Sequence, residues 1–353
     1  MTHYRLFRRA ALAGALALPI LTTGCGLFSQ EASQSIDPPQ NSTQNVSGNA
    51  ADNGTTAAVN QKDQTQMTVY LKDHNGLLAP VTVLASLGGA EKAGQKALEL
   101  MVDGGSSAKE IPEGFQAIIP KGTTVKNFTI VPDQKLAVVD FSKSFAMYTA
   151  AEERQIVEAV TWTLTGMPGI NKVDIWMEGK KLAQMPVNGL PMDGPLTRSV
   201  GINLQAADGV NYSQSTPVTL YFSAVTPNNE SYYVPVTRLV NRSDNKAKSA
   251  IQQLINGPLV TDPLTAVITP DVVVKSVTKK NDIITVELQD NAYQEGQQEP
   301  AEMLQAVVLA LTENTTATKV QIKLNGKTNI IDTNNQSYSE PVSRPEHVNA
   351  FKS

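Results

Sequence analysis

The sequence predicts two tandem copies of an α+β domain, with helices packed on one face of a sheet, behind an N-terminal leader and a polar segment. Two observations support this prediction. The folded part is an internal duplication with a period of about 150 residues, and each copy contains both helical and extended hydrophobic periodicity. With 353 residues and 41% hydrophobic content, the chain is long enough to bury substantial cores.

The duplication consists of short segments that recur in the same order with the same hydrophobic pattern. Two copies at this period indicate tandem domains and not a solenoid. The offset between partners drifts along the chain, which places insertions and deletions in loops. The matching pairs are Thr68–Leu71 and Thr219–Phe222, Ala79–Thr82 and Val234–Thr237, Ala97–Gly104 and Ala250–Gly257, Val125–Lys126 and Val274–Lys275, and Ala159–Lys180 and Ala306–Lys327.

Each copy predicts the order strand–strand–helix–strand–strand–helix–strand. In the second copy, apolar residues at helical spacing indicate both helices. The first of these stops at Asn256–Pro258, and the second has Pro300 near its first turn. In the first copy, the matching second helix begins at the capping box Thr149–Glu152. The apolar stripes comprise Ala247, Ala250, Ile251, Leu254 and Ile255, and Met303, Leu304, Val307, Val308 and Leu311.

The strand between the two helices shows the two-residue period of a half-buried strand. Apolar and polar residues alternate from Ile284 to Leu288 in the second copy. Superposing the copies predicts the same alternation over Ala137–Phe141 in the first copy. Asp140 then lies on the outward face.

The first 25 residues are predicted to form a lipoprotein export signal. Three arginines precede fifteen uncharged residues, Ala10–Gly24, a stretch too short to span a membrane but suited to a signal peptide. Leu21–Cys25 resembles a lipobox, so residues 1–24 are expected to be removed and Cys25 to be diacylated, for example with palmitate. The alternative is a conventionally cleaved signal with an incidental cysteine. Two acyl chains anchor a protein stably, which makes the lipid bilayer an expected partner.

Residues 25–66 are rich in Ser, Gln, Asn, Thr and Gly and are predicted to be a disordered membrane tether. Without the three leader arginines the chain has 26 basic and 33 acidic side chains, a net charge of −7. No basic stripe indicates a nucleic-acid partner. The other expected parts are a first domain at 67–202, a linker at 203–217, a second domain at 218–330 and a C-terminal tail at 331–353 that wraps the last domain.

One cysteine and three histidines exclude a disulfide framework and a conventional Cys/His zinc site. Glu152, Glu153 and Asp140 are the candidate carboxylates for a cell-wall glycosidase. A structural role fits each of them better: Glu152 completes the capping box, Glu153 lies in an exposed first helical turn, and Asp140 faces solvent. We therefore predict no catalytic, metal-binding or cofactor-binding residue, and no enzymatic activity.

The remaining candidate residues also fit structural roles. His74 and Asp282 lie in predicted hairpin turns. Trp162 lies near the inward stripe of a helix, so a core or helix-edge position is favoured over a sugar-stacking platform. Trp176 shares its strand face with two acidic residues, so we expect it to be partly exposed and available for an interface.

A set of short motifs occurs in the same order in both copies, most completely in the first. They are Val69–Leu71, Asp103–Gly104, Ile119–Thr123, Val139–Ser142, Phe145, Thr163–Thr165 and Gly179, and in the second copy Leu220–Phe222, Asn256–Pro258 and Ala310–Thr312. With the leader, these motifs resemble the GerM-like family of sporulation and germination lipoproteins, which have two tandem GerMN domains. The resemblance covers 67–182 and 218–328. The second copy departs at Thr269–Val272, where a Pro-x-Gly-Thr turn is missing, and at Val286–Gln289.

The resemblance implies a fold like that of ring-building domains and a role in endospore formation and germination without known catalysis. Such proteins support the assembly or localisation of the complex between mother cell and forespore, and thereby cortex formation. The implied partners are other extracytoplasmic sporulation proteins, and the implied location is the outer forespore membrane.

Self-association and peptidoglycan binding stay open as further interactions. The alternative function is a peptidoglycan-binding module or a weak wall hydrolase. That alternative calls for aromatic residues clustered with carboxylates on a concave surface, and the 19 aromatic residues show no such cluster in the sequence. The scaffold function is therefore favoured.

Overall fold

The computed structural model describes residues 64–87 and 92–351, which belong to one compact unit spanning Val59–Ser353. The predicted signal peptide, Cys25 and nearly all of the predicted tether lie outside the described residues. Among the helices of the described part of the chain, none is long and apolar enough to cross a membrane.

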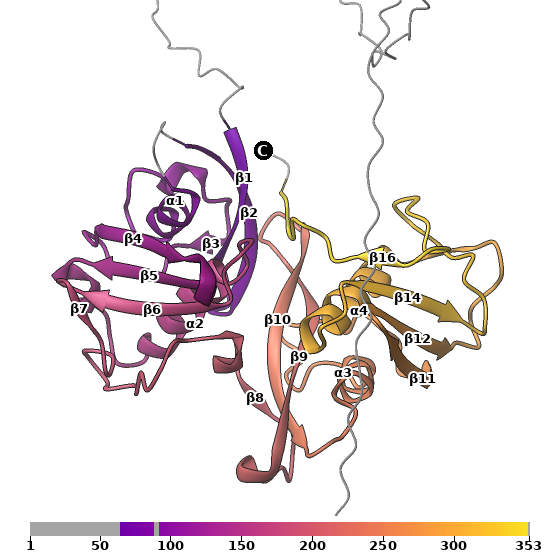
Figure 1. The fold of residues 1–353 in the computed structure, drawn as a ribbon. Coiled ribbons are helices and arrows are strands. Elements are labelled where there is room, and N and C mark those ends of the chain that lie inside the picture. The colour runs from indigo at the N-terminus through magenta and orange to yellow at the C-terminus, as the bar shows by residue number, and fades with distance from the viewer. Residues whose placement is uncertain (1–63, 88–91, 352–353) are drawn as a thin grey trace, which may run out of the picture. The chain divides into compact units, whose positions relative to one another are not determined.

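The first domain has the predicted element order (Figure 1). A long hairpin is followed by a helix, two strands, a second helix and a strand, with two short strands added. The elements are β1 (Gln64–Asp73), β2 (Leu78–Ser86), α1 (Ala93–Leu100), β3 (Phe115–Gln116), β4 (Val125–Val131), β5 (Leu136–Phe141), α2 (Glu153–Leu164), β6 (Lys172–Met177) and β7 (Lys180–Lys181).

The second domain repeats this order, which confirms the duplication. Its short additional strands are β8, β13, β15 and β16. The elements are β8 (Gln205–Ala206), β9 (Ser215–Val225), β10 (Ser231–Asn241), α3 (Lys246–Ile255), β11 (Val273–Lys280), β12 (Ile283–Gln289), β13 (Gln298–Glu299), α4 (Ala301–Asn314), β14 (Lys319–Leu324), β15 (Ile331–Asp332) and β16 (Val342–Ser343).

The hairpin and the remaining long strands of each domain form two separate sheets, where the sequence suggested one. The sheets are β2-β1-β3 and β4-β5-β6-β7 in the first domain, and β8-β10-β9 and β11-β12-β14-β16 in the second. In the first domain, α1 contacts β1 and β4, and α2 contacts β1, β2 and β6. Because the helices pack against both sheets, α2 and α4 are buried on almost every side, and the buried residues of α4 extend beyond the predicted stripe.

The predicted core residues are buried. Helix α3 ends at Ile255, just before the predicted stop at Asn256, and all five residues of its stripe are buried. In β5, Ala137, Val139 and Phe141 are fully buried while Asp140 is half-buried. The sequence periodicity therefore identified the faces of these elements correctly.

The segment that follows each domain crosses to the other domain. After the first domain, Ile202 exchanges hydrogen bonds with Thr237, and β8 pairs in parallel with β10. After the second domain, β16 pairs with β14, and then Val348 and Asn349 accept hydrogen bonds from Thr82 of β2. The tail thus wraps the last domain as expected, but it also closes on the first domain, which the sequence did not indicate.

Two asparagines at these crossings connect β2 to β10. The Asn203 Oδ1 accepts the N–H of Leu78 at 2.9 Å, and Nδ2 donates to the carbonyls of Leu78 and Pro235 at 2.8 and 2.7 Å. Asn349 repeats this pattern with the equivalent residues of the opposite strands, so the two asparagines are related by a pseudo-twofold symmetry. Its partners are the N–H and carbonyl of Tyr233, both at 2.8 Å, and the carbonyl of Pro80 at 2.7 Å.

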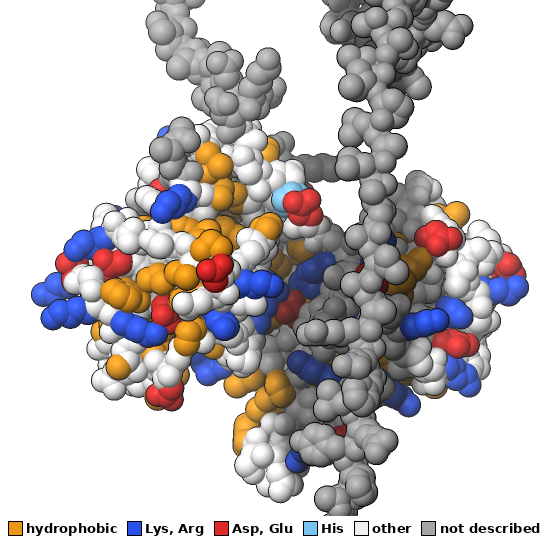
Figure 2. Space-filling model, viewed as in Figure 1, with side chains coloured by type: hydrophobic (Ala, Val, Ile, Leu, Met, Phe, Trp, Pro, Cys, Tyr) orange, Lys and Arg blue, Asp and Glu red, His pale blue; other side chains and the backbone are white. Residues whose placement is uncertain are grey.

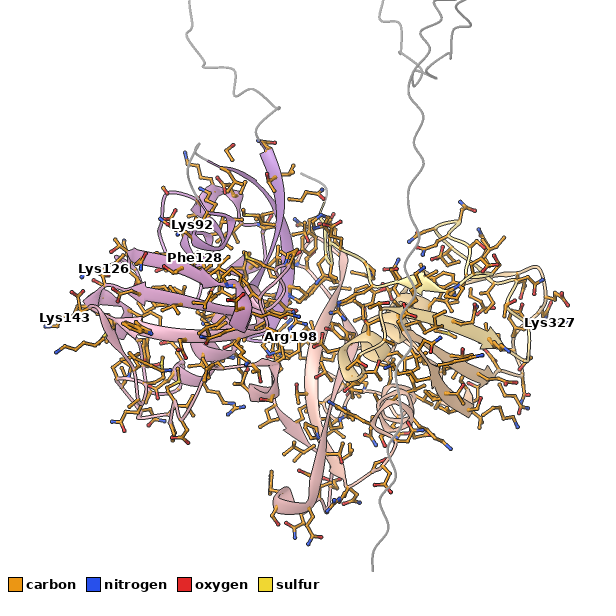
Figure 3. The ribbon with its side chains drawn as sticks, viewed as in Figure 1. Lys92, Lys126, Phe128, Lys143, Arg198 and Lys327 are labelled. Carbon is orange, nitrogen blue, oxygen red and sulfur yellow. The ribbon has the colours of Figure 1, made fainter. Side chains whose placement is uncertain are left out.

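Arg198 and Arg344 form a second equivalent pair beside this joint; Arg198 is labelled in Figure 3. Both pair with the Glu313 carboxylate of α4, at 2.6 and 3.2 Å. Each also donates to a carbonyl and a hydroxyl near the C-terminal end of a helix, where cations are favoured. These acceptors are Trp162 O and Thr165 Oγ1 for Arg198, and Leu309 O and Thr312 Oγ1 for Arg344.

Replacing Asn349 by glycine should lower the free energy of unfolding by about 2 kcal/mol, because three backbone groups of Tyr233 and Pro80 lose their partners. Glycine tolerates the positive φ of Asn349 (56°), so the change removes the side chain without adding backbone strain. Urea denaturation measures the effect. Asn229→Gly is the matched control, since Asn229 also has a positive φ (60°) but lies exposed beyond β9. Equal losses in both variants would contradict the role assigned to Asn349.

Arg238 of β10 is a buried cation without a carboxylate partner within 4.0 Å among the described residues. Its side chain is 0% exposed, and its Nε has no hydrogen-bond acceptor there. Nη1 donates to Gln253 Oε1 at 3.0 Å, and burial lowers the pKa of Arg238 to about 10. The equivalent residue of the first domain is Val83, so an apolar side chain is accommodated at this position of the fold.

Arg238→Met should leave the free energy of unfolding unchanged or raise it by up to about 2 kcal/mol, because a buried charge without a counter-charge is removed while its volume is kept. Thermal and urea denaturation measure this. Arg242→Met, at an exposed position directly after the same strand, should have almost no effect. A loss greater than about 2 kcal/mol on replacing Arg238 would show that its hydrogen bonds outweigh its desolvation.

Candidate binding pocket in the first domain

The first domain contains a pocket of about 640 Å³ between the segment that follows α1 and the segment that precedes α2. We call it the first-domain pocket. Its walls are Lys72 at the end of β1, parts of residues 103–121, and the stretch that includes Met147, Tyr148 and Glu152. The pocket therefore lies where several loops meet at the end of the β2-β1-β3 sheet.

Two of the short sequence motifs build the floor of this pocket. The Met101 carbonyl accepts the N–H groups of both Ile118 and Ile119, so the chain beyond β3 returns to the end of α1. Gly104 has φ +60°, and the Lys121 side chain passes 3.3 Å from the position a Cβ would occupy there. Any larger residue at 104 would strain the backbone and displace Lys121.

The second copy has a different sequence where the first copy forms this wall. Gly122 has φ +79° in the first domain, and the turn closes through the Thr123 N–H to the Pro120 carbonyl at 3.1 Å. In the second copy the corresponding stretch is Thr269–Val272, which contains no glycine. The second copy closes the equivalent turn through the Val272 N–H to the Thr269 carbonyl at 3.3 Å, so the two copies differ here in the glycine and not in the turn hydrogen bond.

Charged groups of both signs line the pocket without neutralising one another. Lys72, Lys121 and Asp103 have no ion pair within 4.0 Å among the described residues. Hydrogen bonds from the N–H and then the hydroxyl of Thr149 lower the pKa of Glu152, and the positive charge of Lys72 contributes in the same direction. Glu152 is therefore ionised at neutral pH. The pocket can offer cations to an acidic group and carboxylates to a basic one.

Glu152 and Glu153 have different environments from those predicted. The Glu152 carboxylate reaches back to the Thr149 N–H at 2.9 Å, which confirms half of the capping box, but Thr149 donates its hydroxyl to Glu152 and does not cap the helix. Glu153 was expected to be exposed, which is wrong: it is 1% exposed. Its carboxylate accepts hydrogen bonds from the Tyr148 hydroxyl and three backbone N–H groups. These belong to Val187, Asn188 and Leu190, at 3.0, 2.7 and 2.9 Å.

Burial alone would raise the pKa of Glu153, but the hydrogen bonds from the loop at 187–190 and from Tyr148 outweigh it and lower the pKa. Conversely, burial and the hydrogen bond to Glu153 raise the pKa of Tyr148. Glu153 is thus a buried anion that holds a loop, because the chain after β7 returns to the start of α2. Nothing in the local sequence of α2 indicates this contact.

The other polar candidates remain separate from one another. Both Asp140 oxygens accept the Gly179 N–H, at 3.0 and 3.1 Å. His74 is exposed in the β1–β2 turn and Asp282 in the β11–β12 turn, as predicted. In the part of the chain that the structure describes, no three His, Cys, Asp or Glu side chains are grouped to hold a metal ion. The three candidate carboxylates therefore each have a different hydrogen-bond partner.

The two tryptophans lie close to where they were predicted. Trp162 is fully buried, its Nε1 donates to the Gly201 carbonyl at 2.8 Å, and the Arg198 guanidinium lies 4.5 Å from the ring. Trp176 is half-buried on β6. Asp174, on the same face, is buried and forms an ion pair with Lys181 at 2.8 Å. Part of this strand face is therefore covered.

The sequence analysis missed a buried carboxylate at the domain joint. Asp73 is 2% exposed, and its Oδ1 accepts the N–H groups of Asn75 and Leu77 in the hairpin turn. Its Oδ2 accepts the hydroxyl of Tyr232, in the second domain, at 2.8 Å. The Asp-x-Asn-Gly sequence did indicate the turn, but the partner lies 159 residues away and has no local signal.

A second concavity, more apolar, lies beside α1 and the C-terminal tail. Hydrophobic side chains gather on the face of the first domain shown in Figure 2. Lys92 and Phe128 lie side by side near this groove (Figure 3), where Lys92 Nζ donates to the Phe128 carbonyl at 2.6 Å. Ile130, on the same strand as Phe128, is 43% exposed. The lining of this groove is mainly apolar, whereas the lining of the first-domain pocket is mainly polar and charged.

Comparisons with known proteins agree with this architecture. Residues 68–183 and 219–330 match the Germane family, described as sporulation and spore germination. The spore germination protein GerM of Bacillus subtilis (strain 168) is 36% identical over 362 residues, covering 96% of this chain and 97% of the relative. The solved tandem GerMN domains of the sporulation protein GerM from Bacillus subtilis match with a TM-score of 0.74 at 34% identity, over 82% of this chain and 100% of that chain.

The fold and the two matched segments define a tandem-domain α+β protein of the sporulation and spore germination class. The chain belongs to the Germane family, and the resemblance inferred from its motifs is confirmed. Its two copies correspond to the tandem GerMN domains of the Bacillus subtilis relative.

Glu153→Gln should lower the free energy of unfolding by about 2 kcal/mol, because an amide cannot accept all four hydrogen bonds from the loop and Tyr148. Since the folded pKa of Glu153 is depressed, its contribution is complete above the ordinary value of 4.5 and is lost as the pH falls through the lower folded pKa. The difference between wild type and variant should therefore shrink on acidification. Urea denaturation at pH 7 and at pH 3 measures both effects.

Glu340→Gln is the control for this change, because Glu340 is exposed in the C-terminal tail. It should be neutral at both pH values. A Glu153→Gln variant as stable as the wild type at pH 7 would contradict the anchoring role of Glu153.

Proposed function

We propose that the protein is a non-enzymatic, lipid-anchored, extracytoplasmic scaffold in endospore formation and germination. It supports the assembly or localisation of the complex between mother cell and forespore, and thereby cortex formation. The observation that carries this proposal is the similarity to the spore germination protein GerM over 96% of the chain, an alignment that extends beyond the two domains.

The geometry supports a binding role. Glu153, Asp140 and Asp73 each accept hydrogen bonds from other parts of the chain, so these carboxylates hold the fold together. The two domains are joined by asparagine side chains and by a shared ion-pair cluster. A joined pair of domains presents its surfaces in a fixed relation, as a scaffold requires.

The anchor proposed for this scaffold is a diacylated Cys25 in the outer forespore membrane. The lipobox-like Leu21–Cys25 follows an uncharged stretch that suits an export signal. The polar composition of 25–66 suits a tether between lipid and folded domains. The net charge of −7 after removal of the leader makes attachment by charge to an anionic membrane unfavourable, so lipid is the means of attachment.

The first-domain pocket favours a second candidate function, a peptidoglycan-binding module. It combines the carboxylates of Asp103, Glu113 and Glu152 with the half-buried ring of Tyr148 on one concave surface. This is the kind of cluster that a wall-binding function calls for, and the sequence alone did not show it. The two functions are compatible, since a scaffold can also hold the wall.

The scaffold proposal is tested by imaging a fluorescent fusion in sporulating cells. Wild-type protein should concentrate at the membrane around the forespore, and Cys25→Ala should abolish this enrichment because the acyl anchor is lost. Fractionation of the same cells should move the variant from the membrane to the soluble extracytoplasmic fraction.

Ser29→Ala, four residues after the cysteine, is the control and should localise as the wild type does. Uniform peripheral fluorescence of the wild type, or unchanged enrichment of Cys25→Ala, would overturn the lipid-anchored sporulation scaffold. In the first case a general envelope lipoprotein that binds wall polymers would replace it.

A further inference from the structure

The first-domain pocket has charges that the fold itself does not use. Lys121 and Asp103 are exposed and Lys72 is half-buried, and none of the three forms an ion pair within 4.0 Å among the described residues. Three other lysines of the described residues, Lys126, Lys181 and Lys327, do form ion pairs. Opposite charges that line one concavity without meeting can each bind a ligand group of the opposite sign.

The same pocket also offers apolar surface. Met147 is 74% exposed at its rim, and Tyr148 is half-buried beside it. A methionine this exposed makes an adaptable apolar contact. Because the Tyr148 hydroxyl is held by Glu153 at 2.9 Å, the ring has a fixed position. A ligand of mixed character, with charged and aliphatic parts, fits this lining better than a purely apolar or purely anionic one.

The size of the pocket limits the ligand further. A volume of about 640 Å³ lies within the range of small-molecule sites, about 300–1,000 Å³. It suits a few amino-acid residues and not a folded domain. Of the motifs that shape it, Asp103–Gly104 recurs in the second copy as Asn256–Gly257, whereas Ile119–Thr123 is replaced there by a stretch without glycine at Thr269–Val272.

We propose that the first-domain pocket binds a short peptide that carries both carboxylates and a free amine, of the kind found in the peptide stems of peptidoglycan. Lys72 and Lys121 bind the carboxylates, while Asp103 and Glu152 bind the amine. Met147 and Tyr148 contact the aliphatic part. This inference rests on the proposed extracytoplasmic location, because only there does the pocket meet the wall.

The test is calorimetric titration of the full-length chain, held in a non-ionic detergent, with a soluble stem tetrapeptide bearing a free side-chain amine. Saturable one-to-one binding is expected. Lys121→Gln and Lys72→Gln should each weaken it about tenfold, since each removes one charge-assisted contact. Lys172→Gln, at an exposed position on β6, is the matched control and should bind as the wild type does.

A second arm separates recognition of the amine from loss of folding. Acetylating the peptide amine should weaken binding to the wild type by about the same factor as Asp103→Asn weakens binding of the free amine. Combining both changes should add little. Thermal denaturation of every variant should give a melting temperature close to that of the wild type, because these side chains lie at the surface.

The inference would be overturned by no saturable binding to the folded wild type, by equal weakening in Lys172→Gln, or by equal binding of a glycan strand without peptide. A titration with a protein-derived peptide of the same charges that binds more tightly than the stem would also overturn it, in favour of a partner protein. If the peptide does not bind but the protein localises to the forespore membrane, the scaffold proposal stands and the pocket inference fails. If the peptide binds but the protein does not localise there, the pocket inference stands and the scaffold proposal fails.

Discussion

The two domains are joined where backbone groups of β2 and β10 need hydrogen-bond partners. β2 is an edge strand of its sheet, and β10 lies between β8 and β9 but pairs with β8 only at Arg238 and Leu239. Backbone groups left unpaired are costly to bury. The side-chain amides of Asn203 and Asn349 supply those partners from both domains at once. Each asparagine belongs to the segment that leaves one domain and binds the other. The two halves therefore stabilise one another, and the tail is part of the joint.

Electrostatics at the joint follow the same duplication but break its symmetry. Arg198 and Arg344 are equivalent, yet one carboxylate, Glu313, serves both. The residue equivalent to Glu313 in the first domain is Gly166, and a Cβ there would lie 3.4 Å from the Arg198 guanidinium. The cluster is thus asymmetric, with two arginines and one glutamate, and it carries one net positive charge. Each guanidinium also makes a cation–π contact, Arg198 with the Trp162 ring and Arg344 with the Tyr221 ring.

Local patterns could predict the elements and their inward faces, because periodicity is set by neighbours within one helix or strand. The stripe of α3 and the alternation of β5 are examples. Contacts across 35 to 159 residues could not be predicted in this way. In the sequence, Glu153 looks like an ordinary acid at the start of a helix, and only the fold shows that the loop at 187–190 donates hydrogen bonds to it. Asp73 likewise looks like a turn residue, and only the fold shows that it accepts the Tyr232 hydroxyl. The pocket is a third case, since its charges come from separate segments of the chain, from Lys72 to Glu152.

Both domains contribute equivalent residues to the joint but differ in what else they contain. Equivalent threonines, prolines and asparagines build the joint on both sides, so neither copy can lose them without weakening its partner. That constraint does not extend to surfaces away from the joint. There the first copy has the Gly122 turn beside its pocket, while the second copy has Thr269–Val272, without glycine, at the equivalent position. A duplication that is fixed at its interface and free elsewhere allows one copy to bind a ligand and the other to support it.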